Sequence, residues 1–497
     1  MRLVLLVLSL AGCSAAIDPR EAAIVGAMVD ADGPLIRSRP SLVAGKYARM
    51  ARRDDVGGEG IFDYYRGCAP VFRADLVDAR LPIAHTEFPA DGPLPVSMGD
   101  AHPENFGVLV AGDGTASFEP NDLDAGDRIP YHWDLRRLTT GLVIAVRQSN
   151  PDDDAARAAA VAVEADVARA CAAAYASEIH AIAGGAPIAR MTDGDGSAVI
   201  ADLFDRSDAG RTTTLSSLTT LGASGRVLLR GAMDPTQPEQ VFVELSSDAR
   251  DALPTVLEAA RLQMSSPPDA AFFTVLDAVR ELGSGVASWP RVRALVLVRG
   301  PTDDPSDDVV LEVKELGDSL TPNVYPPFRP TDDIASRIMM ARARVWSRVD
   351  ADPMWVAVPS WVGMPTQVRT ESDAEPTLRI HRLHDALGTP SALMDLARVL
   401  GTRLARGMAR GLDGEIDPAI AIDRAITRDP DAFAAGEASV AIDEADRTEA
   451  DFAHFQDALD RLGLQLGVPA DPQDRPSAAL EALFCTPPVV PTPEAYR

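Results

Sequence analysis

Residues 99–107 read GDAHPENFG, and residues 121–124, reading NDLD, follow shortly after them. Asparagine occurs only at positions 105, 121, 150 and 323, so half of all asparagines fall in these two stretches. This concentration of carboxylate and amide side chains favours a catalytic loop. The alternative is a capped turn, because Gly, Asp, Asn and Pro are also the residues that turns use.

The chain between the two stretches predicts how they meet. Short runs of strand-forming residues flank a Gly-Asp-Gly sequence at 112–114, which is a strong signal for a β-hairpin. The outer ends of an antiparallel hairpin lie together, so we expect Asp100, Asn105 and Asp122 to come within reach of one cation. Oxygen ligands of this kind suit Mg²⁺ or Mn²⁺.

Composition limits the partners of this chain. With 497 residues, it is long enough for roughly two to four structural units, each with its own core. Its net charge of −27 argues against nucleic acid or an anionic membrane surface as a partner, because both require a basic surface. Any site for a phosphate group must therefore be locally basic.

Lysine is rare, since only Lys46 and Lys314 are lysine among 47 basic residues. Lys314 follows a strand-like run at 309–313, and a turn containing Gly283 and Gly285 lies before it in the chain. In protein kinases a glycine loop covers the donor phosphates while a lysine on a neighbouring strand neutralises them. The alternative for Lys314 is an exposed charge at the end of a strand.

Two arginine-containing segments are less specific. Arg66 lies among three aromatic residues at 62–67, where it is either a buried structural arginine or a contact for an anionic substrate. Residues 331–349 predict a helix with four arginines, which we expect to form a solvated face.

The N-terminal residues have the features of an export signal. A short apolar run ends in small residues, and the sequence LAGC at 10–13 resembles a bacterial lipoprotein signal in which Cys13 is lipidated. Ser14 resembles the residue found in lipoproteins of the outer membrane. We therefore expect an exported protein on the outer membrane, facing the periplasm, whose only membrane contact is its lipid anchor.

Together these segments resemble a bacterial family catalogued as domain of unknown function 2252. The family pattern falls on residues 46–50, 62–67, 99–107, 121–124, 133–138, 283–288, 313–315 and 404–406, within roughly residues 41–410. The family is in turn similar to protein kinases and aminoglycoside phosphotransferases, whose catalytic loop has the form G-D-x-H-x-x-N. Gly99, Asp100, His102 and Asn105 match that form.

The resemblance implies an α+β, two-lobed, protein-kinase-like fold that is rich in helix. It also implies a circular permutation, because the glycine turn and Lys314 follow the catalytic loop here instead of preceding it. Three departures weaken the match to a nucleotide site. Ser288 replaces the third glycine, Met408 replaces an expected histidine, and no glutamate is clearly placed to pair with Lys314.

The lobes are expected to be built from separate parts of the chain. The expected units are a signal peptide at 1–12, a tether at 13–40, a helical catalytic-loop lobe at 41–185, helices completing it at 386–470, a β-rich lobe at 271–385 and an irregular tail at 471–497. Residues 186–270 receive no assignment.

For function, the resemblance implies a Mg²⁺-dependent phosphotransferase that acts on a hydroxyl group of a small molecule or protein. Asp100 would orient that hydroxyl or accept its proton. Asn105 and Asp122 would hold the metal ion, with Asp124 as a second carboxylate ligand.

The remaining roles concern the donor and the support of the loop. Lys314 and the amides around Gly283 and Gly285 would neutralise and cover the phosphates of a nucleoside triphosphate or another donor. Asp134 is expected to brace the catalytic loop, and His102 either takes part in catalysis or supports the loop in the same way.

Export conflicts with this function, because ATP is scarce outside the cytoplasm. The second hypothesis is therefore a non-catalytic lipoprotein whose kinase-like pocket binds a ligand or partner. The third is a metal-dependent hydrolase that uses Asp100, His102, Asp122, Asp124 and His132.

Overall fold

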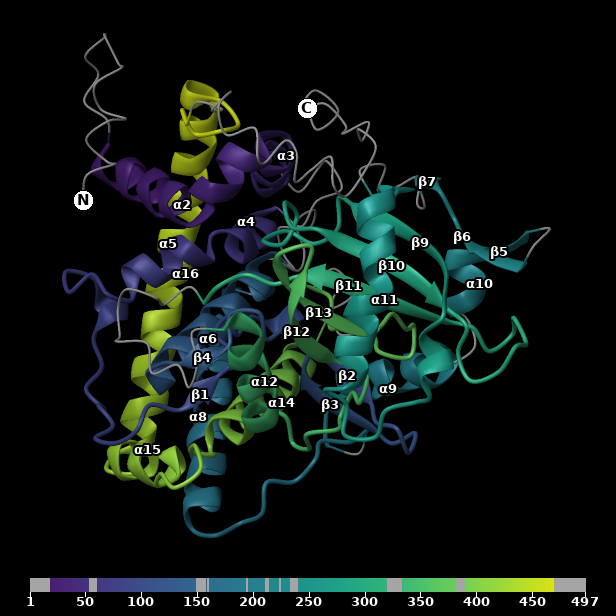
Figure 1. Ribbon diagram of the computed structural model, residues 1–497. Helices are drawn as coiled ribbons and strands as arrows, with labels where there is room; N and C mark the ends of the chain where they lie inside the picture. The colour runs from purple at the N-terminus through teal and green to yellow at the C-terminus, as the bar shows by residue number, and fades with distance from the viewer. Residues whose placement is uncertain are drawn as a thin grey trace.

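The computed structural model describes residues 18–52, 60–148, 158, 161–193, 195–210, 214–222, 225–232, 240–319, 333–380 and 389–468. These residues form a mixed α+β structure in which a helical part and a twisted sheet lie side by side (Figure 1). Within these ranges, no helix has both the length and the apolar character needed to cross a bilayer. Cys13, the expected signal peptide and the expected tail at 471–497 lie outside the described residues.

The helices differ widely in length. They are α2 (Pro19–Ser38), α3 (Pro40–Met50), α4 (Ile61–Gly67), α5 (Ala69–Asp75), α6 (Tyr131–Gln148), α8 (Glu164–Ala183), α9 (Ala198–Gly210), α10 (Thr214–Leu218), α11 (Ser247–Arg261), α12 (Ile334–Val345), α14 (Pro390–Met408), α15 (Pro418–Ile426) and α16 (Pro430–Leu462). Several of them have proline at the first position, which is favourable because proline lacks the N–H that would have no partner there.

The strands form one large sheet and three small hairpins or ribbons. They are β1 (Val96–Ser97), β2 (Phe106–Val110), β3 (Ala116–Pro120), β4 (Asp127–Arg128), β5 (Thr219–Gly222), β6 (Gly225–Leu228), β7 (Gly231–Ala232), β8 (Val241–Glu244), β9 (Val275–Leu282), β10 (Arg293–Val298), β11 (Val309–Glu315), β12 (Val356–Trp361) and β13 (Met364–Thr370).

The large sheet has the strand order β12-β13-β11-β10-β9-β8-β7 and is antiparallel throughout. Alternate residues of a strand point to opposite faces. On β11, Leu311 and Val313 pack in the apolar cluster that includes α11. Lys314 therefore lies on the other face, directly opposite Arg293 of β10.

The sheet begins earlier in the chain than the expected boundary at residue 271. Strand β8 pairs with β9 through Val241 and Leu282, and α11 packs against the sheet from residues that received no assignment. Segment 186–270 thus supplies two strands of the large sheet, β7 and β8, and the covering helix α11. Short strands separated by prolines and by polar segments leave little periodicity for a sequence pattern to detect.

The predicted hairpin is confirmed by the pairing of β2 with β3, in which Val110 lies opposite Ala116. At its outer end, β1 and β4 form a second, two-stranded ribbon through Val96 and Arg128. Loops 98–105 and 121–126 are therefore held between two pairs of strands. This arrangement brings the two motif-bearing stretches together.

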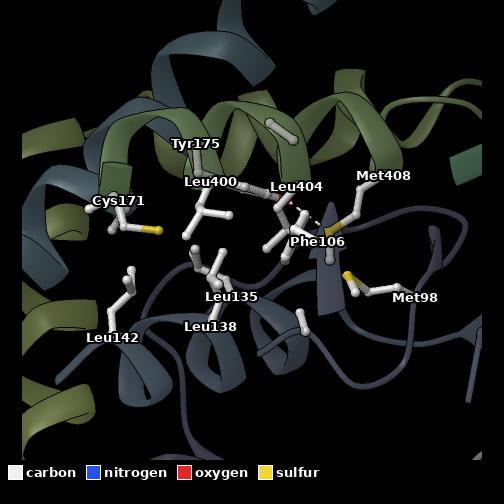
Figure 2. Close-up of a cluster of buried hydrophobic side chains, with 14 of the residues drawn as sticks. Met98, Phe106, Leu135, Leu138, Leu142, Cys171, Tyr175, Leu400, Leu404 and Met408 are labelled. Carbon is white, nitrogen blue, oxygen red and sulfur yellow. Dashed lines mark hydrogen bonds between the residues drawn. The ribbon is translucent and has the colours of Figure 1, made fainter. Parts of the chain in front are cut away.

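A hydrophobic cluster between α6, α8 and α14 supports the first of these loops (Figure 2). Its labelled members on the helices are Leu135, Leu138, Leu142, Cys171, Tyr175, Leu400, Leu404 and Met408. Met98 and Phe106, which flank loop 99–105, join the same cluster. The loop is therefore attached to the helical core at both of its ends.

The expected tether at 13–40 is wrong from Pro19 onward, because these residues form α2. The Asp18 side chain caps this helix. Ile24 and Met28 are fully buried in a cluster that also contains Tyr47 of α3 and Phe455 of α16. This apolar stripe is interrupted by glycines and acidic residues, so the sequence shows little of the periodicity that predicts a long helix.

Candidate active site

A cleft of about 1740 Å³ lies between the sheet and the helical part. It is lined by nine of the residues predicted to form the site, namely Arg66, Asp100, His102, Asn105, Asp122, Asp124, Gly283, Gly285 and Lys314. Asp134 does not line the cleft but contacts the backbone of the loop that does. Residues far apart in the sequence thus meet around one cavity.

Lys314 reaches from β11 to the loop that follows the hairpin. Its Nζ lies 2.7 Å from Oδ2 of Asp124 and 3.7 Å from Oδ2 of Asp122, and its side chain is only 5% exposed. Burial alone would lower the pKa of Lys314, but Asp122 and Asp124 outweigh burial and raise it. The alternative of an exposed strand-end charge is therefore excluded.

Asp124 has capacity for a further partner. Burial and the neighbouring Asp122 raise the pKa of its carboxyl group, and Lys314 opposes this rise. Its Oδ1 atom is buried and has no hydrogen-bond partner among the described residues. An unpaired buried oxygen is costly unless a cation or donor can approach it.

The arrangement of Asn105 suits a metal ligand as well. Its Nδ2 donates to the carbonyl oxygen of Asp100 at 2.9 Å, so Oδ1 is the atom that remains for another partner. The backbone N–H of Asn121 donates to the Asn105 carbonyl oxygen at 3.0 Å and ties the two loops together. Asn105 is thereby fixed beside the carboxylates of loop 121–124.

A magnesium site can be tested against these residues. Over the described ranges, no group of three or more His, Cys, Asp and Glu side chains is arranged to hold a metal ion. Mg²⁺ often uses only one or two carboxylates and completes its shell with water and substrate phosphates. Asp122, Asp124 with its unpaired Oδ1, and the Asn105 amide oxygen fit that kind of site.

Asp100 is oriented by an arginine for which the sequence suggested no role. Arg137 Nε donates to Asp100 Oδ1 at 2.8 Å, and the Arg137 side chain is only 1% exposed. The guanidinium lies 3.8 Å from the centroid of the Tyr65 ring. Among the described residues, Asp100 Oδ2 receives no hydrogen bond, so it remains for a partner in the cleft.

Asp134 lies under the loop and is completely buried. Its carboxylate accepts hydrogen bonds from the backbone N–H groups of Gly99 at 2.8 Å and Ala101 at 3.4 Å, and it pairs with Arg73 at 3.3 Å. Gly99 has a φ of 82°, and a Cβ there would lie 1.9 Å from the carbonyl oxygen of Ala125. Only glycine fits this position, which explains the first residue of the motif.

His102 borders the cleft, but its side chain is almost completely buried. Burial, followed by the charges of Arg66 and Arg137, holds its pKa well below the usual value of 6.5. The ring meets Phe62 edge to face at 6.1 Å, and its Nε2 lies 4.0 Å from Asp100 Oδ2. A neutral, packed imidazole of this kind suits support of the loop better than proton transfer near neutral pH.

The glycine turn joins β9 to β10 at the opposite wall of the cleft. Gly283 and Gly285 both have a φ of 76°, a conformation that other residues rarely adopt. A Cβ on Gly285 would lie 2.6 Å from the Ser288 hydroxyl oxygen. Ser288 thus packs under the turn at the position where the resemblance implies a third glycine.

The N-terminal helices hold this turn in place. Arg39, between α2 and α3, donates to the Pro290 carbonyl oxygen at 2.9 Å and pairs with Glu315 at 2.6 Å. A Cβ on Gly45 would lie 2.7 Å from the indole nitrogen of Trp289, so α3 contacts the end of the turn closely. The sequence had no signal for these contacts, because they join segments far apart in the chain.

Helix α12 contradicts the expectation of a solvated arginine face. Arg337 is 1% exposed and donates to the carbonyl oxygens of Asp124 at 2.7 Å and Gly317 at 3.1 Å. Arg342 is also buried. The helix contains no acidic residue, so Lys314 pairs with the loop carboxylates and not with a helical glutamate.

Two other expectations concern His132 and Met408. His132, at the start of α6, is not among the described residues that line the cleft. Met408 lies in the core, where its sulfur accepts a hydrogen bond from Tyr175 at 3.3 Å (Figure 2). The position at which the resemblance expects a histidine is thus a packing position.

Comparison with known proteins identifies a family for this chain. A family model described as "Uncharacterized protein conserved in bacteria (DUF2252)" matches residues 37–458. No curated protein and no solved structure matches the chain.

Proposed function

This chain belongs to the bacterial DUF2252 family, and we propose that it is a kinase-like phosphotransferase that depends on Mg²⁺ or Mn²⁺. The observation that carries the proposal is the meeting of Lys314 with Asp124 at 2.7 Å, beside Asp122, in the cleft that Asp100 also lines. Phosphoryl transfer requires a cation such as a strand lysine, carboxylates that hold a metal ion, and a loop that carries an Asp–Asn pair.

The order of elements in the sheet supports a kinase-like arrangement. The glycine turn joins β9 to β10, Lys314 lies on the next strand β11, and α12 follows. In kinases a glycine loop, a lysine on the third strand and a helix occur in this order. Because loop 99–105 precedes them here, we propose that the chain is a circular permutation of that fold.

The chain's own residues would act mainly by positioning. Asp100, oriented by Arg137, would accept a hydrogen bond from the acceptor hydroxyl and take its proton as the new O–P bond forms and the donor P–O bond breaks. Asp134 and its hydrogen bonds to the loop backbone would keep Asp100 in place. Lys314 and the N–H groups of the glycine turn would contact the donor phosphates.

Asn105, Asp122 and Asp124 would hold the divalent cation. When bound, it supplies positive charge that neutralises the donor phosphates. Lys314, which pairs with Asp124 at 2.7 Å, would then lie beside the cation.

One observation favours a second candidate, a kinase-like binding protein without catalytic activity. Lys314 is paired with Asp124 and Asp122, and α12 offers no glutamate to draw it away. Export as a lipoprotein through Cys13, which we also propose, would place the site where ATP is scarce. The protein would then use a phosphate donor other than ATP, or it would use no donor and act only by binding.

Thermal unfolding with Mg²⁺ and a panel of nucleotides and other phosphate donors tests the proposal. We expect a metal-dependent rise in Tm for wild type, lost in Asp122→Asn and kept in Asp395→Asn, whose carboxylate is 45% exposed on α14. Transfer of phosphate should disappear in Asp100→Asn while donor binding remains. If no donor changes the Tm of wild type, the phosphotransferase proposal fails and the binding-protein candidate stands.

A separate experiment tests the anchor. Cells expressing the full chain are labelled with a palmitate analogue and fractionated. We expect a labelled protein in the outer-membrane fraction and no label in Cys13→Ala. Label that persists in the variant would rule out lipidation at this cysteine.

A further inference from the structure

One wall of the cleft is formed by three arginines that come from distant parts of the chain. We call Arg49, Arg66 and Arg379 the arginine wall. Arg49 pairs with Asp63 at 3.2 Å, and Arg66 lies 3.7 Å from the same carboxylate. Arg66 and Arg379 then share Oε2 of Glu104, at 2.8 and 3.1 Å.

The wall presents positive charge to the cleft. The side chains of Asp63 and Glu104 are completely buried, whereas those of Arg49, Arg66 and Arg379 are 18, 15 and 42% exposed. The carboxylates thus lie beneath the guanidinium groups and hold them in place. In a chain with a net charge of −27, a row of partly exposed guanidinium groups inside a cleft is a local concentration of positive charge.

The wall is positioned by the catalytic loop itself. Glu104 belongs to the same loop as Asp100, and its Oε1 accepts a hydrogen bond from the Ile380 backbone N–H at 2.8 Å. The segment carrying Arg379 is held against β2, because the Leu378 N–H donates to the Phe106 carbonyl oxygen at 2.9 Å. Arg66 and Arg379 therefore sit beside the Asp100 loop, whereas Arg49 lies 5.7 Å from the centroid of the Trp289 ring, at the end of the glycine turn.

We propose that the arginine wall binds a carboxylate or phosphate group of a small-molecule acceptor whose hydroxyl is oriented by Asp100. That the bound molecule is a phosphate acceptor rests on the proposed phosphotransferase function. The binding of an anion by these arginines does not. Guanidinium groups present planar pairs of N–H donors that match carboxylate and phosphate oxygens. Arg379, the most exposed of the three, has donors that Glu104 does not use, since only its Nη1 contacts that carboxylate.

The test is isothermal titration with inorganic phosphate and with succinate at fixed ionic strength, without nucleotide or metal ion. We expect both anions to bind wild type and to bind Arg379→Gln roughly 10-fold more weakly, as expected for loss of one charged hydrogen bond. Arg379→Lys should recover part of the affinity. Arg66→Gln should weaken binding in the same way. If the Arg66→Gln variant does not fold, Arg379→Gln still tests the proposal.

Two control variants separate the wall from other sites. Arg398→Gln removes an arginine that is 53% exposed on α14 and should leave binding unchanged. Lys314→Met removes the ammonium group proposed to contact the donor phosphates. It should change the affinity for succinate and phosphate by no more than about twofold. Loss of binding in Lys314→Met but not in Arg379→Gln would place the anion at the donor side and overturn the proposal.

Other outcomes would overturn it too. Equal weakening in Arg398→Gln and Arg379→Gln would show general charge screening, and no binding to wild type would exclude the site. Binding of acidic serine peptides, but of neither small anion, with the same dependence on Arg379 would assign the wall to a protein acceptor. If no donor binds but both small anions do, the phosphotransferase proposal is excluded and the anion site remains.

Discussion

Lys314 Nζ lies 2.7 Å from Asp124 Oδ2, and this ion pair joins the sheet directly to the loop that follows the β2–β3 hairpin. Asp122 lies within 3.7 Å of the same ammonium group. The lysine thus occupies the carboxylates that a divalent cation would use. Lys314 and a metal ion are therefore expected to compete for Asp122 and Asp124.

That competition predicts that Lys314→Met binds Mg²⁺ more tightly than wild type does. Without the ammonium group, two neighbouring carboxylates face each other unpaired, and a cation relieves their repulsion. We expect roughly a 10-fold gain in Mg²⁺ affinity by isothermal titration without nucleotide. The double variant Lys314→Met/Asp124→Asn should lose this gain. Unchanged affinity in Lys314→Met would show that Mg²⁺ does not bind at these carboxylates.

A second prediction concerns the brace that Asp134 forms under loop 99–105. Asp134→Asn removes the charge that the buried Arg73 faces and weakens the hydrogen bonds to Gly99 and Ala101. Breaking a buried pair of this kind costs about 3 kcal/mol, measured as the change in the free energy of unfolding in urea. Asp395→Asn, in an exposed pair with Arg398, should cost at most about 0.5 kcal/mol. Equal costs for the two variants would show that Asp134 does not brace the loop.

The burial of His102 predicts a pH dependence of stability. Its pKa in the folded protein is well below 6.5, whereas in the unfolded chain it has the ordinary value near 6.5. The unfolded chain therefore gains a proton first as the pH falls below 6.5, and stability decreases by up to about 1.4 kcal/mol per pH unit. His102→Gln lacks this term, so its destabilisation should be smaller at pH 5 than at pH 7. A destabilisation that is equal at both pH values would mean that His102 titrates normally in the folded protein.

The parts of the site that follow from local patterns could be predicted from the sequence. A Gly-Asp-Gly turn between two strand-like runs determines a hairpin, and a hairpin brings its outer ends together. The closeness of Asn105 to Asp122 therefore follows from the sequence pattern alone. The scarcity of lysine pointed to Lys314, because it is one of only two lysines in the chain.

The supporting arginines could not be predicted in the same way. Arginine supplies nearly all the basic residues, so composition does not separate Arg137, Arg39 or Arg337 from the arginines on the surface. Each contacts a partner on another element, namely Asp100, Glu315 or the Asp124 carbonyl oxygen. Contacts of this kind depend on tertiary distances, which helix and strand periodicity do not contain.

The packing of the helical part gives a final prediction from two glycines. Gly401 of α14 lies against α8 so closely that a Cβ there would be 2.1 Å from the backbone carbonyl oxygen of Cys171. Gly401→Ala must therefore push the two helices apart, and we expect a loss of about 2–3 kcal/mol in the free energy of unfolding.

Gly436 provides the control. It is exposed on α16, and a Cβ added there would meet no other atom within 4 Å. Gly436→Ala should stabilise by about 0.5–1 kcal/mol, because alanine favours helix. Urea unfolding of both variants measures the difference. Similar effects of the two changes would show that α8 and α14 do not pack at this distance, and the cluster that anchors loop 99–105 would need another arrangement.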